Sequence, residues 1–281
     1  MVAQVPELKP GTEPYPGYCL KQFIGSGGWG EVWRATRPDG QPVALKFLPC
    51  GSRQQASREI RAIQFVRNLE HPYLIGINQI WSGADYIVVS MELAEGNLLD
   101  LYEVYYEEFR KPIPANHLCY YLGHAASALD FLNTRQHMIN GRRVAVRHCD
   151  VKPSNLLITG NTVKLCDYSL SVQATSSMWY YEKVGTLAYA APEVFRGWIS
   201  DSSDQYSLAL TYHHLRTGTL PFDEYPRSFS SSYTRPDPDL SGLAKGEQPI
   251  LRRALCPTPQ DRWPSCTDMI EQLARVVPKD K

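Results

Sequence analysis

The sequence predicts an α+β protein in which a strand-rich segment of about ninety residues comes before a helix-rich segment. Apolar residues alternate between turn signals over residues 18–89, whereas helical apolar stripes dominate the remainder of the chain. The chain has 281 residues and shows no internal repeat, which suits one domain or two lobes that share a cleft.

The strand-rich segment begins with a predicted hairpin. Residues 31–35 and 42–48 are strand-like, and residues 37–40, with the sequence Arg-Pro-Asp-Gly, are typical of a turn. A further strand is predicted over residues 86–89 and leads to Met91.

A helix is predicted between the second and third of these strands. Ser52 and Gln55 have the spacing of a capping box, and His71-Pro72 marks a point by which the helix has ended. The apolar residues between these signals recur at helical intervals and are Ala56, Ile60, Ile63 and Val66.

The second segment is predicted to be mostly helical. Helices are expected over residues 202–216 and 266–277. An earlier helix carries one apolar stripe, made of Leu118, Leu122, Ala125, Leu129 and Leu132.

Non-helical parts of the second segment are a hairpin and two loops. Residues 156–158 and 163–166 are predicted strands around a turn at residues 159–162. Residues 133–143 are polar, and residues 223–239 are rich in Ser, Pro and Tyr, so both are expected to be loops, the second of them exposed.

Composition limits the kinds of partner. The 29 Lys and Arg residues balance 29 Asp and Glu residues without a long basic block, which argues against nucleic acid or an anionic membrane as the main partner. No run approaches about 18 apolar residues, and the first seven residues lack a signal peptide's pattern, so neither a transmembrane helix nor a leader is expected. Seven scattered cysteines without a Cys-x-x-Cys pair favour reduced thiols in a cytoplasm.

A glycine-rich stretch gives the first functional signal. Residues 25–30 (Gly-Ser-Gly-Gly-Trp-Gly) have the spacing Gly-x-Gly-x-x-Gly, which lets a backbone approach phosphates closely. Dinucleotide-binding folds continue from such a loop into a helix and place a carboxylate about twenty residues later. Here a strand follows, and Leu45 stands beside Lys46 at that distance, which favours a lid over a nucleotide or a plain glycine-rich turn.

Several motifs then occur in an order that resembles the bacterial (Hanks-type) relatives of eukaryotic serine/threonine protein kinases. Residues 43–46 (Val-Ala-Leu-Lys) are similar to the strand that carries the ATP-binding lysine, and residues 91–94 to the gatekeeper and hinge. Residues 148–155 (His-Cys-Asp-Val-Lys-Pro-Ser-Asn) are similar to the catalytic loop. Residues 191–193 (Ala-Pro-Glu) are similar to the end of the activation segment, and the resemblance extends from about Tyr18 to Leu273.

The resemblance implies a bilobal protein-kinase fold, with a small β-rich lobe, a larger helical lobe and an ATP cleft between them. It implies a non-specific serine/threonine protein kinase that takes ATP as co-substrate with Mg²⁺ or Mn²⁺. The expected divisions are a loose lead-in at 1–17, a kinase domain at 18–275 with N-lobe 18–91, hinge 92–95 and C-lobe 96–275, and a tail at 276–281.

The resemblance also implies an ATP-binding set. Lys46 would reach the α- and β-phosphates with Glu59 as its partner, although Glu59 could instead be a surface carboxylate among arginines. Backbone groups of Glu92 and Ala94 would bind adenine, although these residues could simply connect two lobes. The implied set is Ile24, Gly25, Ser26, Gly27, Gly28, Trp29, Gly30, Val32, Ala44, Lys46, Glu59, Met91, Glu92, Ala94 and Leu157.

Catalytic and metal-binding roles follow from the same resemblance. Asp150 would orient the attacking hydroxyl, Lys152 would stabilise the γ-phosphate, and Thr186 would contact both of them. Asn155 and Asp167 would hold Mg²⁺. A lysine at position 152 is typical of serine/threonine rather than tyrosine kinases.

Two further residues match the scaffold of the family. Arg262 matches the arginine that pairs with the glutamate at position 193, and a buried pair there would be structural. Asp204 matches the helix aspartate that holds the backbone of the catalytic loop.

The sequence departs from the family at Cys149 and at Tyr168-Ser169, and Cys166 has two possible roles. Cys149 stands where regulated kinases carry an arginine that binds a phosphate, so activity is expected not to depend on phosphorylation of residues 175–177. Tyr168-Ser169 replaces Phe-Gly, which puts switching at that point in question. Cys166 is either an inert core thiol or a reactive one at the ATP site.

Other classes of protein compete with this interpretation. A pseudokinase would bind nucleotide without transferring phosphate, and the altered Tyr168-Ser169 pair is the best support for it. A small-molecule kinase would lack the segment at residues 185–193 that resembles a peptide-docking platform. A structural or interaction module would not need the metal-ligand pair.

Overall fold

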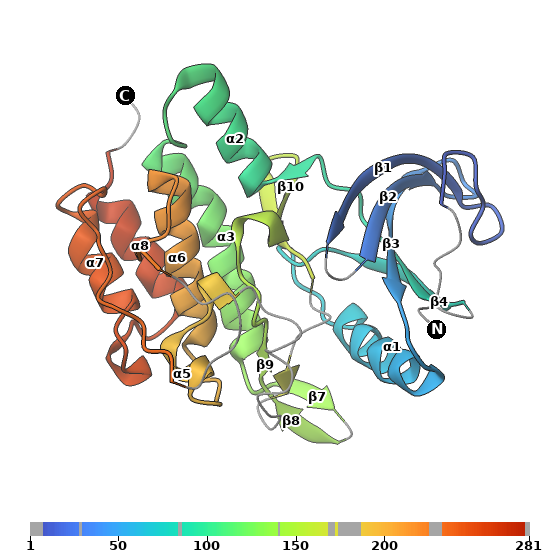
Figure 1. The fold of residues 1–281 in the computed structure, drawn as a ribbon. Coiled ribbons are helices and arrows are strands. Elements are labelled where there is room, and N and C mark those ends of the chain that lie inside the picture. Colours follow the sequence, from blue (N-terminus) through green and yellow to red (C-terminus); the bar gives the residue numbers. More distant parts are fainter. Residues whose placement is uncertain are drawn as a thin grey trace. The chain divides into compact units, whose positions relative to one another are not determined.

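The protein is described here by a computed structural model that covers residues 8–27, 30–83, 86–139, 141–167, 172–173, 187–224 and 232–278 (Figure 1). The chain divides into two compact units. The first comprises residues 1–70 and 75–95, and the second comprises residues 71–74 and 96–281.

An antiparallel five-stranded sheet and one helix make up the first unit. The strands follow the order β1-β2-β3-β5-β4 across the sheet, so that the chain enters at one edge. The elements are β1 (Cys19–Gly27), β2 (Gly30–Thr36), β3 (Pro42–Pro49), α1 (Arg53–Arg67), β4 (Ile77–Ser82) and β5 (Tyr86–Met91).

One face of this sheet carries a cluster of buried hydrophobic side chains. Paired residues of neighbouring strands share a face, and side chains alternate between faces along each strand. Pairing of Trp33 with Leu45 and of Phe47 with Val88 therefore puts these four apolar side chains on the same face. Tyr18, Leu20, Ala35 and Val43 complete the buried cluster.

Helix α1 packs against residues of the other face. Its apolar stripe behaves as predicted, because Ile63 and Val66 are buried and Ala56 and Ile60 pack against a second cluster. That cluster contains Leu48, Ile87 and Val89 of the sheet. The helix ends at Arg67, before the His71-Pro72 signal.

Residues 8–17, expected as a loose lead-in, pack onto the first unit. Leu8 contacts the core cluster, and the ring of Tyr15 stacks on Trp81 with centroids 4.5 Å apart. The backbone joins in, because Gly11 N–H donates to Leu20 and Leu20 N–H donates to Thr12. Apolar side chains within a proline-rich stretch explain this difference.

The second unit is mostly helical, with short strands. Its helices are α2 (Leu98–Phe109), α3 (Ala115–Asn133), α5 (Pro192–Phe195), α6 (Ser203–Thr217), α7 (Glu247–Ala254) and α8 (Cys266–Val276), with 3-10 turns η1 (Pro153–Asn155), η3 (Leu187–Tyr189) and η4 (Pro259–Asp261). Its strands are β6 (Gly96–Asn97), β7 (His137–Ile139), β8 (Arg142–Val144), β9 (Val146–Arg147), β10 (Leu156–Thr159), β11 (Thr162–Leu165) and β12 (Val172–Gln173). They pair as β11-β10-β6, β12-β9 and β7-β8.

Helix α3 forms the centre of the helical packing and lies beside α6 and α8 (Figure 1). All five residues of its predicted stripe, from Leu118 to Leu132, are buried. A polar contact fixes α8 against it, because the Asp130 carboxylate accepts hydrogen bonds from the backbone N–H groups of Cys266 and Thr267 at 2.8 and 2.9 Å. These donors belong to the first turn of α8, where a carboxylate is favoured.

Residues 133–143 differ from the predicted polar loop, because strands β7 and β8 form a hairpin there. His137 anchors the hairpin, with its Nε2 atom 2.9 Å from the Phe131 carbonyl oxygen and its ring edge-on to Phe131. Gly141 has φ of 76°, and the Asn-Gly dipeptide that contains it is the usual signal of a two-residue hairpin turn.

None of the helices in the described ranges combines the length and the apolar character needed to span a bilayer.

Gly30 is required for packing in the first unit. Its φ is 115°, and a Cβ atom at this position would lie 1.7 Å from the carbonyl oxygen of Phe47 on the neighbouring strand. We expect Gly30→Ala to lower the free energy of unfolding by about 2 to 4 kcal/mol, because backbone strain and a clash with a buried strand act together.

Gly25, in the same glycine-rich stretch, is the matched control. A Cβ atom there would meet no atom of the described residues within 4 Å, and its backbone is not in the positive-φ region. Urea denaturation of Gly30→Ala and Gly25→Ala measures the difference. Equal stability of the two variants would contradict the packing requirement.

Candidate functional site

The backbone at the start of the predicted catalytic loop is held by Asp204, in the first turn of α6. Its carboxylate accepts hydrogen bonds from the N–H groups of His148 and Cys149, each at 2.8 Å. All three residues are buried. The role that the sequence suggested for Asp204 is confirmed.

His148 joins this loop to the residue before Asp167. Its Nδ1 atom accepts a hydrogen bond from the Asp150 N–H at 3.2 Å, which assigns the ring proton to Nε2. The Nε2–H group then donates to the carbonyl oxygen of Cys166 at 2.8 Å. The ring of His148 thus ties the backbone of Asp150 to that of Cys166, the residue before Asp167.

The structure brings Asp150, Lys152 and Asn155 together around one carboxylate. The Nζ atom of Lys152 lies 2.8 Å from Asp150 Oδ2, and the Nδ2 atom of Asn155 donates to the same oxygen at 2.9 Å. Asn155 Nδ2 also donates to the Asp150 carbonyl at 2.8 Å. The Asp150 side chain is only 1% exposed and that of Lys152 is 24% exposed, so a fixed carboxylate lies next to a partly accessible cation.

Asn155 and Asp167 are neighbours across the β10–β11 hairpin. Leu156 pairs with Leu165, and the Cys166 N–H donates to the Asn155 carbonyl at 3.0 Å, so one predicted metal ligand lies just before β10 and the other just after its partner β11. Because Asn155 Nδ2 makes both bonds to Asp150, the Oδ1 oxygen is the amide atom suited to a cation. A carboxylate and an amide oxygen are ligands that Mg²⁺ accepts, so these residues fit the metal.

Asp167 and Cys149 both have backbone angles that are uncommon outside glycine. Their φ values are 68° and 67°. Such left-handed residues raise the free energy by roughly 1–3 kcal/mol each and persist only where the surroundings hold them. Their presence in this loop and directly after β11 indicates that the backbone is shaped to direct these side chains.

Four predicted ATP-binding residues share one face of the sheet in the first unit. Val32 pairs with Lys46, and Ala44 pairs with Met91, while residues 44 and 46 are two positions apart on β3. This face also carries Leu48, against which α1 packs. Glu59 lies on α1, where burial raises the pKa of its carboxyl group, as expected for an inward-facing carboxylate rather than a surface one.

The remaining ATP-binding predictions are placed as follows. Ile24, Gly25, Ser26 and Gly27 belong to β1, Gly30 begins β2, and Leu157 lies on β10 in the second unit, paired with Asn97. Glu92 and Ala94 follow β5, and the Glu92 N–H donates to the Gly76 carbonyl at 2.9 Å. Gly28, Trp29, Tyr168, Ser169, residues 175–177 and Thr186 lie outside the described residues.

Glu193 of α5 and Arg262 form a buried ion pair. Two parallel hydrogen bonds of 2.9 and 2.7 Å join the guanidinium to the carboxylate, and both side chains are at most 1% exposed. Burial opposes ionisation of Glu193, but Arg262 together with Ser203 and Ser200 holds its pKa below the ordinary value. The pair was predicted, whereas the two serines gave no signal in the sequence.

Arg235 was missed by the sequence analysis. It lies in the stretch 223–239 that was expected to be exposed, yet it is 7% exposed and donates to three backbone carbonyls at residues 187–190. Composition gave no warning, because an arginine among Ser, Pro and Tyr is normally solvated.

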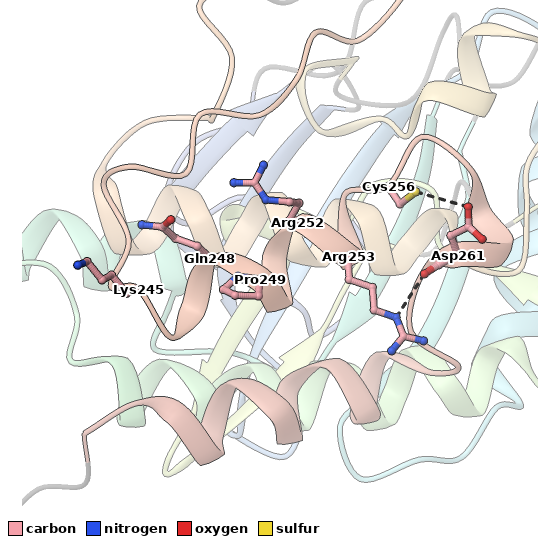
Figure 2. A pocket seen from close by; sticks show the side chains of 7 residues that line it. All are labelled: Lys245, Gln248, Pro249, Arg252, Arg253, Cys256 and Asp261. Atoms are coloured by element: carbon pink, nitrogen blue, oxygen red, sulfur yellow. Dashed lines mark hydrogen bonds between the residues drawn. The ribbon is translucent and has the colours of Figure 1, made fainter.

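A hollow of about 460 Å³ lies along α7 (Figure 2). None of the residues that line this hollow belongs to the catalytic loop. Arg253 is fixed at its wall, 4.1 Å from the ring of Trp263 and bonded to the carbonyls of Asp261 and Arg262. The lining residues are Lys245, Gln248, Pro249, Arg252, Arg253, Cys256 and Asp261.

Comparisons with known proteins agree on one family. The sequence model described as the protein kinase domain matches residues 18–281. The serine/threonine-protein kinase PknF of Mycobacterium tuberculosis is 27% identical over an alignment of 277 residues that covers 92% of this chain and 56% of PknF. The SNF1-like protein kinase ssp2 of Schizosaccharomyces pombe is 28% identical over 87% of this chain and 42% of its own. The human NUAK family SNF1-like kinase 1 is 29% identical over 87% and 36%.

The chain thus spans about half the length of the curated relatives that it matches.

Removing one partner of the buried ion pair should be costly. We expect Glu193→Gln to lower the free energy of unfolding by about 3 kcal/mol, because Arg262 stays buried with its charge unbalanced. Glu271→Gln breaks an exposed pair with Arg275, at 3.8 Å, and should change it by less than about 0.5 kcal/mol. Chemical denaturation measures the free energy of unfolding of both variants. Similar losses of stability in Glu193→Gln and Glu271→Gln would show that burial does not determine how much an ion pair contributes.

Stability should fall in mild acid. Burial lowers the pKa of both His124 and His214 below 6.5, with His213 contributing at His214. The Nδ1 atom of His124 accepts a hydrogen bond from the Val163 N–H, which a proton would break, and Nδ1 of His214 lies 2.5 Å from the Tyr189 hydroxyl. The unfolded chain therefore binds more protons below pH 6.5, and stability decreases as pH falls through that value.

Thermal unfolding between about pH 7 and about pH 5.5 measures this effect. The midpoint should fall by several degrees, and high salt should not remove the fall, because burial rather than an ion pair causes it. Glu193 and Glu247, whose pKa values are lowered, contribute stability that is lost only at more acidic pH. His214→Gln should reduce the fall, whereas the exposed His117→Gln should leave it unchanged.

Proposed function

We propose that this chain, which belongs to the protein kinase domain family, transfers the γ-phosphate of ATP to serine and threonine hydroxyls of protein substrates. The observation that carries the proposal is the arrangement of Lys152 and Asn155 around the buried carboxylate of Asp150. Similarity to serine/threonine-protein kinases, PknF among them, supports the choice of acceptor.

Asp150 is assigned the role of orienting the attacking hydroxyl and accepting its proton. Two donors, Lys152 and Asn155, fix the position of Oδ2, and the Asp150 backbone is fixed in turn by His148. A carboxylate that is oriented before the substrate arrives loses little entropy during the reaction. Lys152, being partly exposed, is assigned to the negative charge of the transferred phosphate.

Asn155 and Asp167 are assigned to a divalent cation, and Mg²⁺ or Mn²⁺ fits their oxygen atoms. When bound, the cation neutralises charge on the β- and γ-phosphates. The protein's contribution is to hold the two side chains at adjacent strand ends, through the Cys166–Asn155 backbone hydrogen bond and the left-handed backbone at Asp167.

ATP contacts are assigned to the set that the sequence analysis named. In the first unit, the shared sheet face of Val32, Ala44, Lys46 and Met91 supports this assignment. The Glu92 N–H is bonded to Gly76, so the adenine contact assigned to Glu92 falls to its carbonyl oxygen. The kinase domain is assigned to residues 18–275, with the hinge at 92–95.

Two further assignments concern regulation and location. Cys149 is buried, and its thiol lies 3.5 Å from the Arg147 carbonyl, which supports activity that does not depend on a phosphate in the activation segment. A cytoplasmic location is supported by the odd number of scattered cysteines.

Replacing the proposed base tests the function. Asp150→Asn should lower phosphorylation of a generic protein substrate by roughly 10²- to 10⁴-fold, because the amide cannot accept the hydroxyl proton. Labelled ATP with Mg²⁺ and phosphoamino-acid analysis measure the transfer, and label should appear on serine and threonine. Glu271→Gln, an exposed carboxylate, is the matched control and should retain full activity.

A second measurement separates an enzyme from a nucleotide-binding scaffold. Wild type and Asp150→Asn should both be stabilised by ATP with Mg²⁺ in a thermal shift assay. Binding without transfer by the wild type would favour the pseudokinase alternative, and equal transfer by wild type and Asp150→Asn would exclude Asp150 as the base.

A further inference from the structure

The segment Leu187–Ala190, which comprises η3 and the next residue, has its backbone carbonyls bound by side chains. The Nη2 atom of Arg235 donates to the carbonyls of Leu187, Ala188 and Ala190, each at 2.8 Å, and its Nε atom donates to Ala190 at 3.3 Å. The hydroxyl of Ser207, from α6, donates to the Tyr189 carbonyl at 2.9 Å. Four consecutive carbonyls therefore each accept a side-chain hydrogen bond.

Arg235 is enclosed by aromatic rings. Its guanidinium carbon lies 4.9 Å from the ring centre of Phe222, 5.5 Å from Phe195 and 5.6 Å from Tyr233. Within the part of the chain that the structure describes, no carboxylate pairs with this buried charge. A buried cation is costly unless it is compensated, and here the carbonyl oxygens and ring faces compensate it.

Residues around the segment are fixed by separate contacts. The Tyr189 hydroxyl lies 2.5 Å from Nδ1 of His214 on α6, and Glu193, three residues after the segment, is bound to Arg262. Within the described residues, Arg235 is the side chain that donates to the carbonyls of Leu187, Ala188 and Ala190. Loss of Arg235 would therefore loosen three carbonyls while Tyr189 and Glu193 stay attached.

We infer that Arg235 is a positioning residue, which fixes the segment Leu187–Ala190 for binding of the protein substrate. The inference rests on the proposed function, and on the resemblance by which the segment at residues 185–193 is expected to dock a peptide substrate. Arg235 acts through its hydrogen bonds to the backbone of the segment, and these bonds need no added phosphate. Because Cys149 carries no charge to bind a phosphate, this contact gives the segment order without phosphorylation.

The geometry of the contact predicts that lysine cannot replace Arg235. Nε and Nη2 are separate donors in a rigid plane, whereas a lysine ammonium is a single point on a flexible stem. Nη1 has no hydrogen-bond partner in the described residues, so the bonds to the segment run through the other two nitrogens.

The experiment compares Arg235→Ala and Arg235→Lys with Arg253→Ala. Arg253 of α7 is the matched control, because its guanidinium also lies over an aromatic ring and binds two backbone carbonyls, those of Asp261 and Arg262. Figure 2 shows its bond to Asp261. Steady-state kinetics with a protein substrate and with ATP, and hydrogen exchange of the amides at residues 187–190, are measured for each.

We expect Arg235→Ala to lower kcat/KM for the protein substrate by about ten- to a hundredfold, as misplacement of a substrate-binding segment does, while KM for ATP stays unchanged. Amide exchange at residues 187–190 should increase in the same variant. Arg235→Lys should keep the fold yet lose most of the activity, and free guanidinium should restore part of it in Arg235→Ala. Arg253→Ala should match wild type in all these measurements.

Other outcomes overturn the inference. Equal kinetics for Arg235→Ala and Arg253→Ala, with wild-type exchange at residues 187–190, would show that Arg235 does not position the segment. Unfolding of both Arg235 variants would make it a folding residue only. Absence of transfer by the wild type would instead refute the proposed function, and the exchange measurement would still decide whether Arg235 orders the segment.

Discussion

The site depends first on the carboxylate of Asp204 and its two hydrogen bonds to the catalytic loop. Cys149 is held with a positive φ, which costs roughly 1–3 kcal/mol for a residue with a side chain. A hydrogen bond to a charged group contributes about 1.5–3 kcal/mol, so the two bonds from His148 and Cys149 outweigh that strain. Without them the loop would relax, and Asp150 would lose the backbone position that aims its carboxylate.

Helix α6 extends this control to the rest of the second unit. It is buried along almost its whole length, and several of its polar side chains form hydrogen bonds with neighbouring backbone and carboxylate groups. Asp204 holds the catalytic loop, Ser207 holds the Tyr189 carbonyl, and Ser203 donates to Glu193. Farther along, the Tyr212 hydroxyl donates to Glu247 of α7. A helix with such a polar buried face shows little apolar periodicity, yet its position determines that of several site residues.

The sequence predicted those parts of the fold and site whose signals are local. The stripe on α3 and the β10–β11 hairpin depend on residues close together in the chain, and both stand in the structure as expected. The spacing from Asp150 to Asn155 is also local, and the two side chains lie within hydrogen-bonding distance. The β7–β8 hairpin was not predicted because its sequence is polar and a single Asn-Gly dipeptide is its main turn signal. Gly30 was predicted for a phosphate-binding role, but its φ and the nearby Phe47 carbonyl add a packing requirement that spacing cannot reveal.

Arg235 is the clearest limit of reasoning from sequence. Its acceptors, at residues 187–190, are more than forty positions away in the chain, as shown by the separation of 45 between Arg235 and Ala190. Nothing in the stretch 223–239 indicates that a cation there is enclosed by Phe195, Phe222 and Tyr233.

The departure at Cys149 and the contact of Arg235 are connected through the backbone that each one fixes. The Cys149 thiol is enclosed and lies against the Arg147 carbonyl, so position 149 interacts with its own loop. An arginine at that position would have to extend toward a phosphate to be useful, whereas Arg235 reaches uncharged carbonyls that are always present. Carbonyl oxygens are part of the backbone, whereas a phosphate must be added by another enzyme. The aromatic rings keep water from competing for the guanidinium. In the proposed function, a segment ordered in this way needs no phosphorylation before it binds substrate.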